Sequence, residues 1–104
     1  MKKFYWSAIS NDQRIKSISE ISGIIDQYGI ILNFQRFSDI SLGLMIEMEE
    51  RKVNQLYDQL KNVILIEGFD SWPTDSTMDC MVLINITFLK GTGDLKIEVP
   101  AIIE

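Results

Sequence analysis

Residues 40–49 read ISLGLMIEME, and this stretch carries the clearest secondary-structure signal in the chain. Every second residue is apolar, and the set consists of Ile40, Leu42, Leu44, Ile46 and Met48. The residues between them are Ser41, Gly43, Met45, Glu47 and Glu49. Successive side chains of a β-strand point to opposite faces of a sheet. The alternation therefore predicts a strand with one face against a core and the other face turned away from it.

Two amphipathic helices are predicted, one before this strand and one after it. The first begins in the polar segment 10–13, where Ser10 and Gln13 have the spacing of a capping box. Gly29 is suited to end it with a left-handed cap. The second helix opens at the acidic pair 49–50. Their apolar stripes are Ile15, Ile18, Ile21 and Ile25 in the first helix, and Val53, Leu56, Tyr57 and Leu60 in the second.

Further strands are predicted at residues 2–9, 30–36, 63–67 and 80–89, with a loop at 70–79. The segment 90–94, KGTGD, predicts a hairpin turn that leads into a returning strand at 95–99. The order strand, helix, strand, strand, helix, strand is that of the ferredoxin-like βαββαβ sandwich. We therefore expect one α+β domain over residues 1–104, with a ferredoxin-like core at 3–67 and an additional C-terminal β-hairpin at 80–99.

The core segment resembles the ACT domain, a small regulatory module that binds ligands. The resemblance rests on a first strand at 4–9, a polar junction at 10–14, a helix that ends in IIDQYGI at 24–30, and an apolar segment that reaches Asn33. The strand at 42–49 and the helix at 51–60 follow in the family's order. The resemblance implies a dimer and a small carboxylate or amino-acid ligand. Amino-acid-binding ACT domains usually carry a glycine in the first junction, which residues 11–15 lack, so the resemblance supports the fold and the dimer better than the ligand.

The composition narrows the classes of partner and compartment. The net charge of −5 repels nucleic-acid phosphates, so we expect no nucleic-acid partner. No apolar run approaches the roughly 20 residues of a membrane-spanning helix, so we expect no membrane partner. Cys80 is the only cysteine, which favours a reducing compartment because no disulfide can form within one chain. The prediction is a cytoplasmic protein.

Residue types that carry catalysis or bind metals are sparse. The chain has no histidine, so the usual general base and the usual zinc ligand are missing. Cys80 alternates in phase with Val82 and Ile84, which predicts a buried, inert thiol. The acidic groups Glu47, Glu49 and Glu50, and Asp70, Asp75 and Asp79, are interpreted as solvated surface and loop. The glycines at 91 and 93 lead into a strand rather than a helix, unlike a phosphate-binding loop. We expect no catalytic residue, no metal and no cofactor.

The junction between the first strand and the first helix is the best candidate for a small ligand. It consists of Ser10, Asn11, Asp12, Gln13 and Arg14. A helix N-terminus offers free N–H groups to a carboxylate, and an arginine can pair with the same group in a bidentate way. The alternative is simple helix capping with the arginine in solvent.

More apolar strand surface is predicted than two helices can cover. The uncovered set is Ser41, Gly43, Met45, Met81, Leu83 and Leu89, with Trp72 in the neighbouring loop. An apolar patch of this kind marks an interface, and symmetric dimers are the commonest oligomers. We therefore predict a homodimer acting as a non-catalytic regulatory or sensor domain. A scaffold module that binds another protein, and a small cofactor-free enzyme of the dimeric α+β barrel type, are the alternatives.

Overall fold

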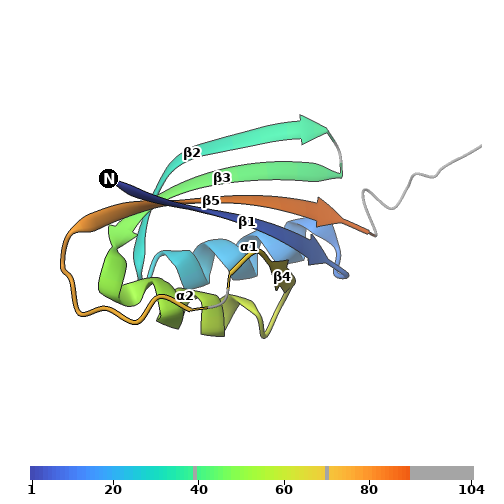
Figure 1. Cartoon of the computed structure of the whole chain (residues 1–104). Helices are drawn as coiled ribbons and strands as arrows, with labels where there is room; N and C mark the ends of the chain where they lie inside the picture. Colours follow the sequence, from blue (N-terminus) through green and yellow to red (C-terminus); the bar gives the residue numbers. More distant parts are fainter. Residues whose placement is uncertain (39, 70, 90–104) are drawn as a thin grey trace, which may run out of the picture.

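The computed structural model describes residues 1–38, 40–69 and 71–89 and shows a sheet with two α-helices against it (Figure 1). The α+β class predicted from the sequence is confirmed. The elements in chain order are β1 (Lys2–Ser10), α1 (Arg14–Ile25), β2 (Gly29–Ser38), β3 (Ser41–Glu49), a short 3-10 helix (Glu50–Lys52), α2 (Val53–Leu60), β4 (Leu65–Glu67) and β5 (Asp79–Phe88).

The strand order is β2-β3-β5-β1-β4, which differs from the predicted ferredoxin-like sheet. In a split βαβ arrangement β1 and β3 are neighbours, whereas here β5 lies between them. β5 is parallel to β1 and antiparallel to β3, and it pairs along nearly its whole length on both sides. Its helix-facing residues are all apolar and all buried, so the centre of the sheet is where this strand removes most apolar surface from water.

The prediction of a hairpin appended to the core is therefore wrong for its first strand. Both edges of β5 are hydrogen-bonded to its neighbours, so no edge of β5 is left for a hairpin partner. The predicted turn at 90–94 and the predicted returning strand at 95–99 lie outside the described residues.

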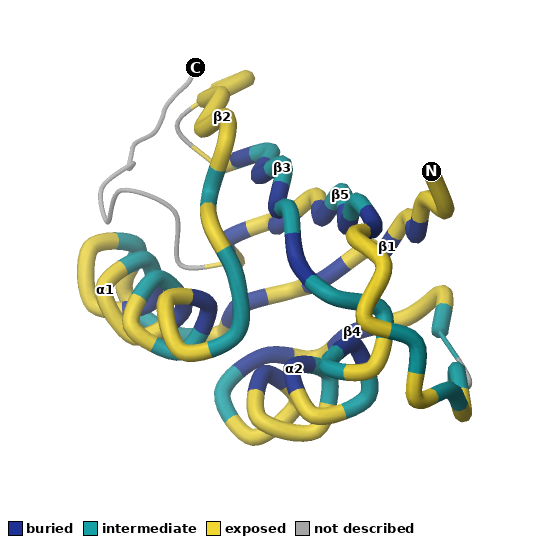
Figure 2. Tube along the Cα trace, turned by 90° about the vertical axis from the view of Figure 1, so that its left-hand side faces the viewer, coloured by how far each residue is buried: buried dark blue, intermediate teal, exposed yellow. Residues whose placement is uncertain are grey.

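Both helices cover the same face of the sheet, as predicted, and the core lies between the two layers (Figure 2). Every second residue of β1, β3 and β5 points into this layer. α2 contributes the three buried residues of its predicted stripe. The largest fully buried side chains are Trp6, Phe88, Ile21, Ile25, Leu42, Ile46, Leu56, Leu60, Ile84, Ile86, Val53 and Val82.

The ends and the buried face of α1 differ from the prediction. The helix begins at Arg14 without a side-chain cap. Ile15, a member of the predicted apolar stripe, is 82% exposed, while the polar Ser17 is buried. Ser17 is tolerated there because its hydroxyl lies 2.7 Å from the buried Ser10 hydroxyl, and the pair satisfies both groups. Gly29 does not cap the helix but begins β2.

Gly29 is needed for close contact between β2 and β3. A Cβ placed on it would lie 2.6 Å from the Glu47 carbonyl oxygen and 2.8 Å from the Met48 Cβ. Among the described glycines only Gly68 has a positive φ, at 98°, and it turns the chain away after β4.

The loop between β4 and β5 is fastened to the start of α2. The Asn54 side chain donates to the Trp72 carbonyl and accepts from the Trp72 N–H, both at 2.8 Å. The Trp72 indole donates to Glu50 at 3.2 Å and stacks edge-on against Phe4. The loop is therefore held beside the core where it leads into the first residue of β5, Asp79.

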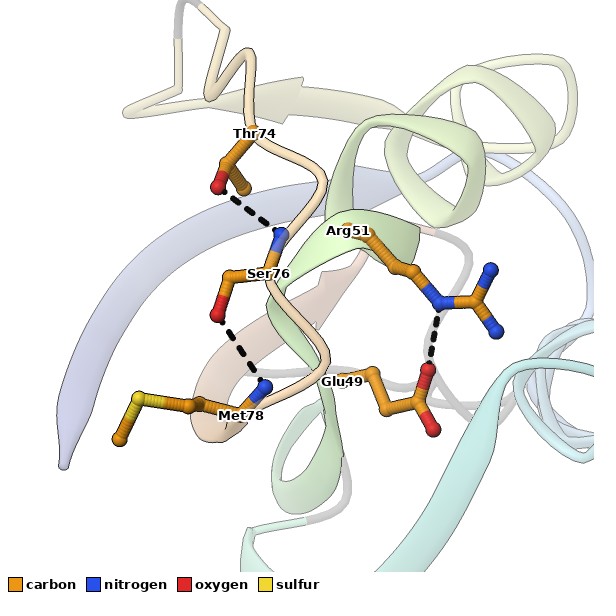
Figure 3. A network of polar contacts seen from close by, with 5 residues as sticks. All are labelled: Glu49, Arg51, Thr74, Ser76 and Met78. Carbon is orange, nitrogen blue, oxygen red and sulfur yellow. Dashed lines mark hydrogen bonds and ion pairs between the residues drawn. The ribbon is translucent and has the colours of Figure 1, made fainter.

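The last part of the same loop follows the end of β3 (Figure 3). The Ser76 N–H donates to the Thr74 hydroxyl, and the Met78 N–H donates to the Ser76 hydroxyl, both at 3.1 Å. Beside them the Arg51 side chain donates to Glu49 at 2.6 Å. These local bonds give the Thr74 and Ser76 hydroxyls a structural role in the loop.

Candidate functional site

One face of the sheet has no described helix over it, and we call it the open face. On β1, β3 and β5 it consists of the residues that alternate with the buried ones. Cross-strand pairing places these residues in rows that run across the sheet. The open face consists of Lys3, Tyr5, Ser7 and Ile9 of β1, Ser41, Gly43, Met45 and Glu47 of β3, Met81, Leu83, Asn85 and Thr87 of β5, with Leu65 and Glu67 of β4 and Asn33, Gln35 and Phe37 of β2.

The middle of the open face is uncharged and partly apolar. Leu83 of β5 pairs with Tyr5 on one side and with Met45 on the other. Tyr5 is 66% exposed, whereas Leu65, 63% exposed at the β4 edge, lies in a separate row with Ile9. Large apolar side chains on adjacent strands make a contiguous patch, which is the usual mark of a binding surface.

Two opposite charges flank this patch in a single row. Lys3 and Glu47 pair with Met81 from its two sides. Neither makes an ion pair with another residue in the described part of the chain. Their separation across β5 is two strand spacings, about 9.6 Å, which is too far for a direct bond.

A hollow of about 310 Å³ lies on the open face between β2 and β1. Its polar groups are the side chains of Asn33, Gln35, Asn85 and Ser7, and its aromatic walls are Tyr5 and Phe37. No acidic or basic side chain lines it. The hollow is therefore a neutral pocket of mixed polar and apolar character.

Irregular pairing in β2 builds one side of this hollow. Register shifts between Ile31 and Asn33, and between Arg36 and Ser38, mark two bulges. Bulges re-aim side chains, and they occur often beside functional sites. The first bulge brings Asn33 and Gln35, which pair with Met45 and Gly43, to the open face, and Phe37 alternates in phase with them.

Gly43 forms the floor beneath the Phe37 ring. A Cβ placed on Gly43 would lie 2.8 Å from Phe37 Cε2 and 3.3 Å from Asn85 Oδ1. Any side chain at this position would displace the ring or crowd the amide. The glycine thus serves close packing of an aromatic ring on the sheet rather than an unusual backbone angle.

The predicted ligand residues at 10–14 lie together at the start of α1, but their side chains do not converge. Ser10 is fully buried, and its hydroxyl accepts the Asp12 N–H at 3.3 Å in addition to the Ser17 contact. Asp12 pairs with Lys16 at 3.5 Å. Gln13 occupies the N-cap position, and Arg14 is the first helical residue. Asn11 points instead toward a second hollow, of about 350 Å³, that Leu89 and Lys61 also line.

Five of the predicted interface residues gather on the open face: Ser41, Gly43, Met45, Met81 and Leu83. Leu89 is exposed just beyond β5, at the second hollow. Trp72 lies apart from them, because it packs against the helix-facing ring of Phe4. Sequence reasoning missed Asn33, Gln35, Phe37 and Asn85. The alternation of β5 indicates Asn85, whereas the bulge before Asn33 reverses the faces that strict alternation from Ile31 would give the β2 residues.

The remaining candidates for chemistry stay structural. Burial raises the pKa of the Cys80 thiol to about 11, and the nearby acids Glu50 and Asp79 add to the shift. A thiol with such a pKa is a poor nucleophile at neutral pH. The Arg51 side chain lowers the pKa of Glu49 by hydrogen bonding to it. Within residues 1–38, 40–69 and 71–89, no three metal-binding side chains come together.

No known family model matches this chain, and neither a curated protein nor a solved structure shows significant similarity to it. Of the helices that the structure describes, none combines the length and the apolar composition needed to cross a bilayer.

Proposed function

We propose that this chain is a non-catalytic, ACT-like regulatory module that works as a homodimer, with the open face as the surface between two copies. The observation that carries the proposal is the uncovered patch around Leu83 at the centre of a five-stranded sheet. The two helices lie on the opposite face, so within residues 1–38, 40–69 and 71–89 no helix covers the patch, and a second molecule could cover it. A second copy is the simplest partner because closed two-fold dimers are the commonest assemblies.

The order of the strands favours a two-fold axis along β5. β5 is the middle strand, with β3 and β1 beside it and β2 and β4 outside. A rotation about an axis parallel to β5, between two stacked sheets, lays β1 of one copy over β3 of the other. In this arrangement Lys3 of each copy faces Glu47 of the other copy. The row of opposite charges is thereby self-complementary, as an isologous interface requires.

The expected contact is of modest size. Five strands about 4.8 Å apart, with paired segments of about 20 Å, give a planar footprint of about 500 Å² per copy. Two copies would bury about 1,000 Å², which is the lower bound for a biological interface. We therefore expect a dimer that dissociates on dilution rather than a permanent one.

A charge at the centre of the open face tests this function. In Leu83→Asp, an unpaired carboxylate would have to be desolvated on dimerisation, which strongly disfavours association. The matched control is Ile15→Asp, because Ile15 is an equally large apolar residue that is 82% exposed on α1, away from the open face.

Light scattering coupled to size exclusion, over a series of concentrations, reads out the result. Wild type and Ile15→Asp are expected to reach twice the mass of one chain as concentration rises. Leu83→Asp is expected to stay at the mass of one chain, with an unchanged circular dichroism spectrum. A wild-type protein that stays monomeric at every concentration would overturn the proposal.

The small-carboxylate site at residues 10–14 is a second candidate, favoured by one observation. No side chain caps the first turn of α1, so its N–H groups are available beside Arg14. A thermal-shift screen with amino acids and small carboxylates, on wild type and Arg14→Ala, checks it. A melting-temperature rise that Arg14→Ala abolishes would support this site, and no rise with any compound would remove the reason for it.

A further inference from the structure

The hollow on the open face has the chemistry of a ligand site. Three carboxamide side chains line it, those of Asn33, Gln35 and Asn85. None of the three makes a side-chain hydrogen bond to another residue in the part of the chain that the structure describes. Toward the described residues, each carboxamide therefore keeps both donors and its acceptor available for a ligand.

The lining decides the charge of that ligand. The hollow contains no ionisable acid or base apart from the Tyr5 phenol. The charged residues nearest to it on the same face are Glu47, Glu67 and Lys3, two acids and one base, and the chain as a whole carries a net charge of −5. A carboxylate or phosphate would find no cation in the hollow itself and an excess of acids around it, which disfavours its binding. The ligand group that enters must be neutral.

The walls decide its shape. The Phe37 ring lies over Gly43 and is 59% exposed, so one of its faces is free to stack. Tyr5 offers a second aromatic surface across the hollow. The volume of about 310 Å³ is at the small end for ligand pockets, which run from about 300 to 1,000 Å³. It accommodates a flat one-ring or two-ring molecule.

We propose that this hollow binds a neutral, flat heterocycle that carries a hydrogen-bond donor and acceptor side by side, as pyrimidine and purine bases do. The ring stacks on Phe37, and the carboxamides of Asn33, Gln35 and Asn85 bond to its donor–acceptor edge. The bulge between Ile31 and Asn33 and the glycine at 43 serve to assemble these groups on one patch of sheet. This inference rests on the open face being the binding surface proposed above, because a second copy laid over β5 encloses the ligand.

Nuclear magnetic resonance titration with uracil and with hypoxanthine tests the proposal on the whole chain. The side-chain NH₂ signals of Asn33, Gln35 and Asn85 are expected to shift together and to saturate. Orotate, which is uracil bearing a carboxylate, is the matched charged probe and is expected to leave them unmoved. Equal shifts with orotate would overturn the neutral class of ligand.

Two variants locate the site. Gly43→Ala puts a methyl group where the Phe37 ring lies, so it is expected to abolish the shifts. Asn85→Ala, an exposed change that should not affect folding, is expected to weaken binding by about fivefold, the value of one hydrogen bond. Shifts that persist unchanged in both variants would overturn the site.

The charge-reversed variant Lys3→Glu separates this inference from the homodimer. Lys3 does not line the hollow, so a monomeric Lys3→Glu protein is expected still to bind uracil, though with lower affinity. A wild-type dimer that binds neither base would overturn the ligand proposal and leave the homodimer standing. A wild-type monomer that binds uracil would overturn the homodimer and leave the hollow standing as a site.

Discussion

Replacing Ile84 by alanine tests whether β5 lies at the centre of the sheet. Ile84 is 1% exposed and pairs with Trp6 on one side and Leu44 on the other. Alanine removes three carbons, which is about 2.4 kcal/mol in transfer free energy at about 0.8 kcal/mol per carbon. Rigid neighbours on both strands leave a cavity, so the expected loss in free energy of unfolding is about 3–4 kcal/mol.

Urea unfolding followed by tryptophan fluorescence measures this loss. With a slope of about 1.5 kcal/mol per molar urea, the midpoint is expected to fall by about 2–2.7 M. Asn85→Ala is the control on the next residue, which is exposed on the open face, and it should change stability by less than about 0.5 kcal/mol. A loss below about 1 kcal/mol for Ile84→Ala would place β5 at the periphery and refute the observed strand order.

Three further predictions follow from local geometry. Gly29→Ala would place a Cβ 2.6 Å from a backbone oxygen, so it is expected to lower the free energy of unfolding by about 1–3 kcal/mol. The control Gly23→Ala, whose Cβ has nothing within 4 Å, should raise the free energy of unfolding by about 0.5–1 kcal/mol. Equal effects of the two substitutions would contradict the close contact at Gly29. Asn54→Ala removes both bonds to the Trp72 backbone, so hydrogen exchange should accelerate at residues 71–78, and unchanged exchange would count against the fastening. The folded-state pKa of Cys80 is raised from 9.0 to about 11, so the folded state favours the neutral thiol. The free energy of unfolding should therefore fall as pH rises from about 9 to 11. A Cys80→Ala protein that loses the same stability over this range would show that Cys80 is not the cause.

Local sequence patterns predicted the strands and helices well, because each pattern depends only on residues that are close together in the chain. The alternation at 40–49 predicted β3, and the apolar stripes predicted both helices and the face they cover. Asp12 and Lys16, which are four residues apart in the sequence, form an ion pair at 3.5 Å. The short-range spacing of charged and apolar residues is thus reflected directly in the secondary structure and in the local ion pair.

The strand order was not predicted because it depends on competition between distant segments. The residues of β5 alternate like those of an edge hairpin, and no local signal says that β5 inserts between β1 and β3. The burial of β5 on the helix side decides its place. The hydrogen bond between the Ser10 and Ser17 hydroxyls was not predicted for a related reason. Two polar residues seven positions apart can bond to each other only after the strand and the helix have packed together.

The candidate site was predicted in part. The period of β3 and β5 put Met45, Met81 and Leu83 on an uncovered face, and the structure gathers them there. The carboxamide hollow was not predicted, because the bulge between Ile31 and Asn33 shifts the period of β2 and brings Asn33 and Gln35 beside Asn85. The role of Gly43 is visible only where the ring of Phe37 crosses it.

Sedimentation equilibrium of charge-reversed variants tests the two-fold homodimer most directly. If Lys3 of each copy faces Glu47 of the other, then Lys3→Glu and Glu47→Lys should each raise the dimer dissociation constant about tenfold or more, through like-charge contacts. The double variant should restore the wild-type constant, because it rebuilds both pairs with their signs exchanged. A double variant that associates as weakly as the single ones, or single variants that associate like wild type, would contradict the arrangement.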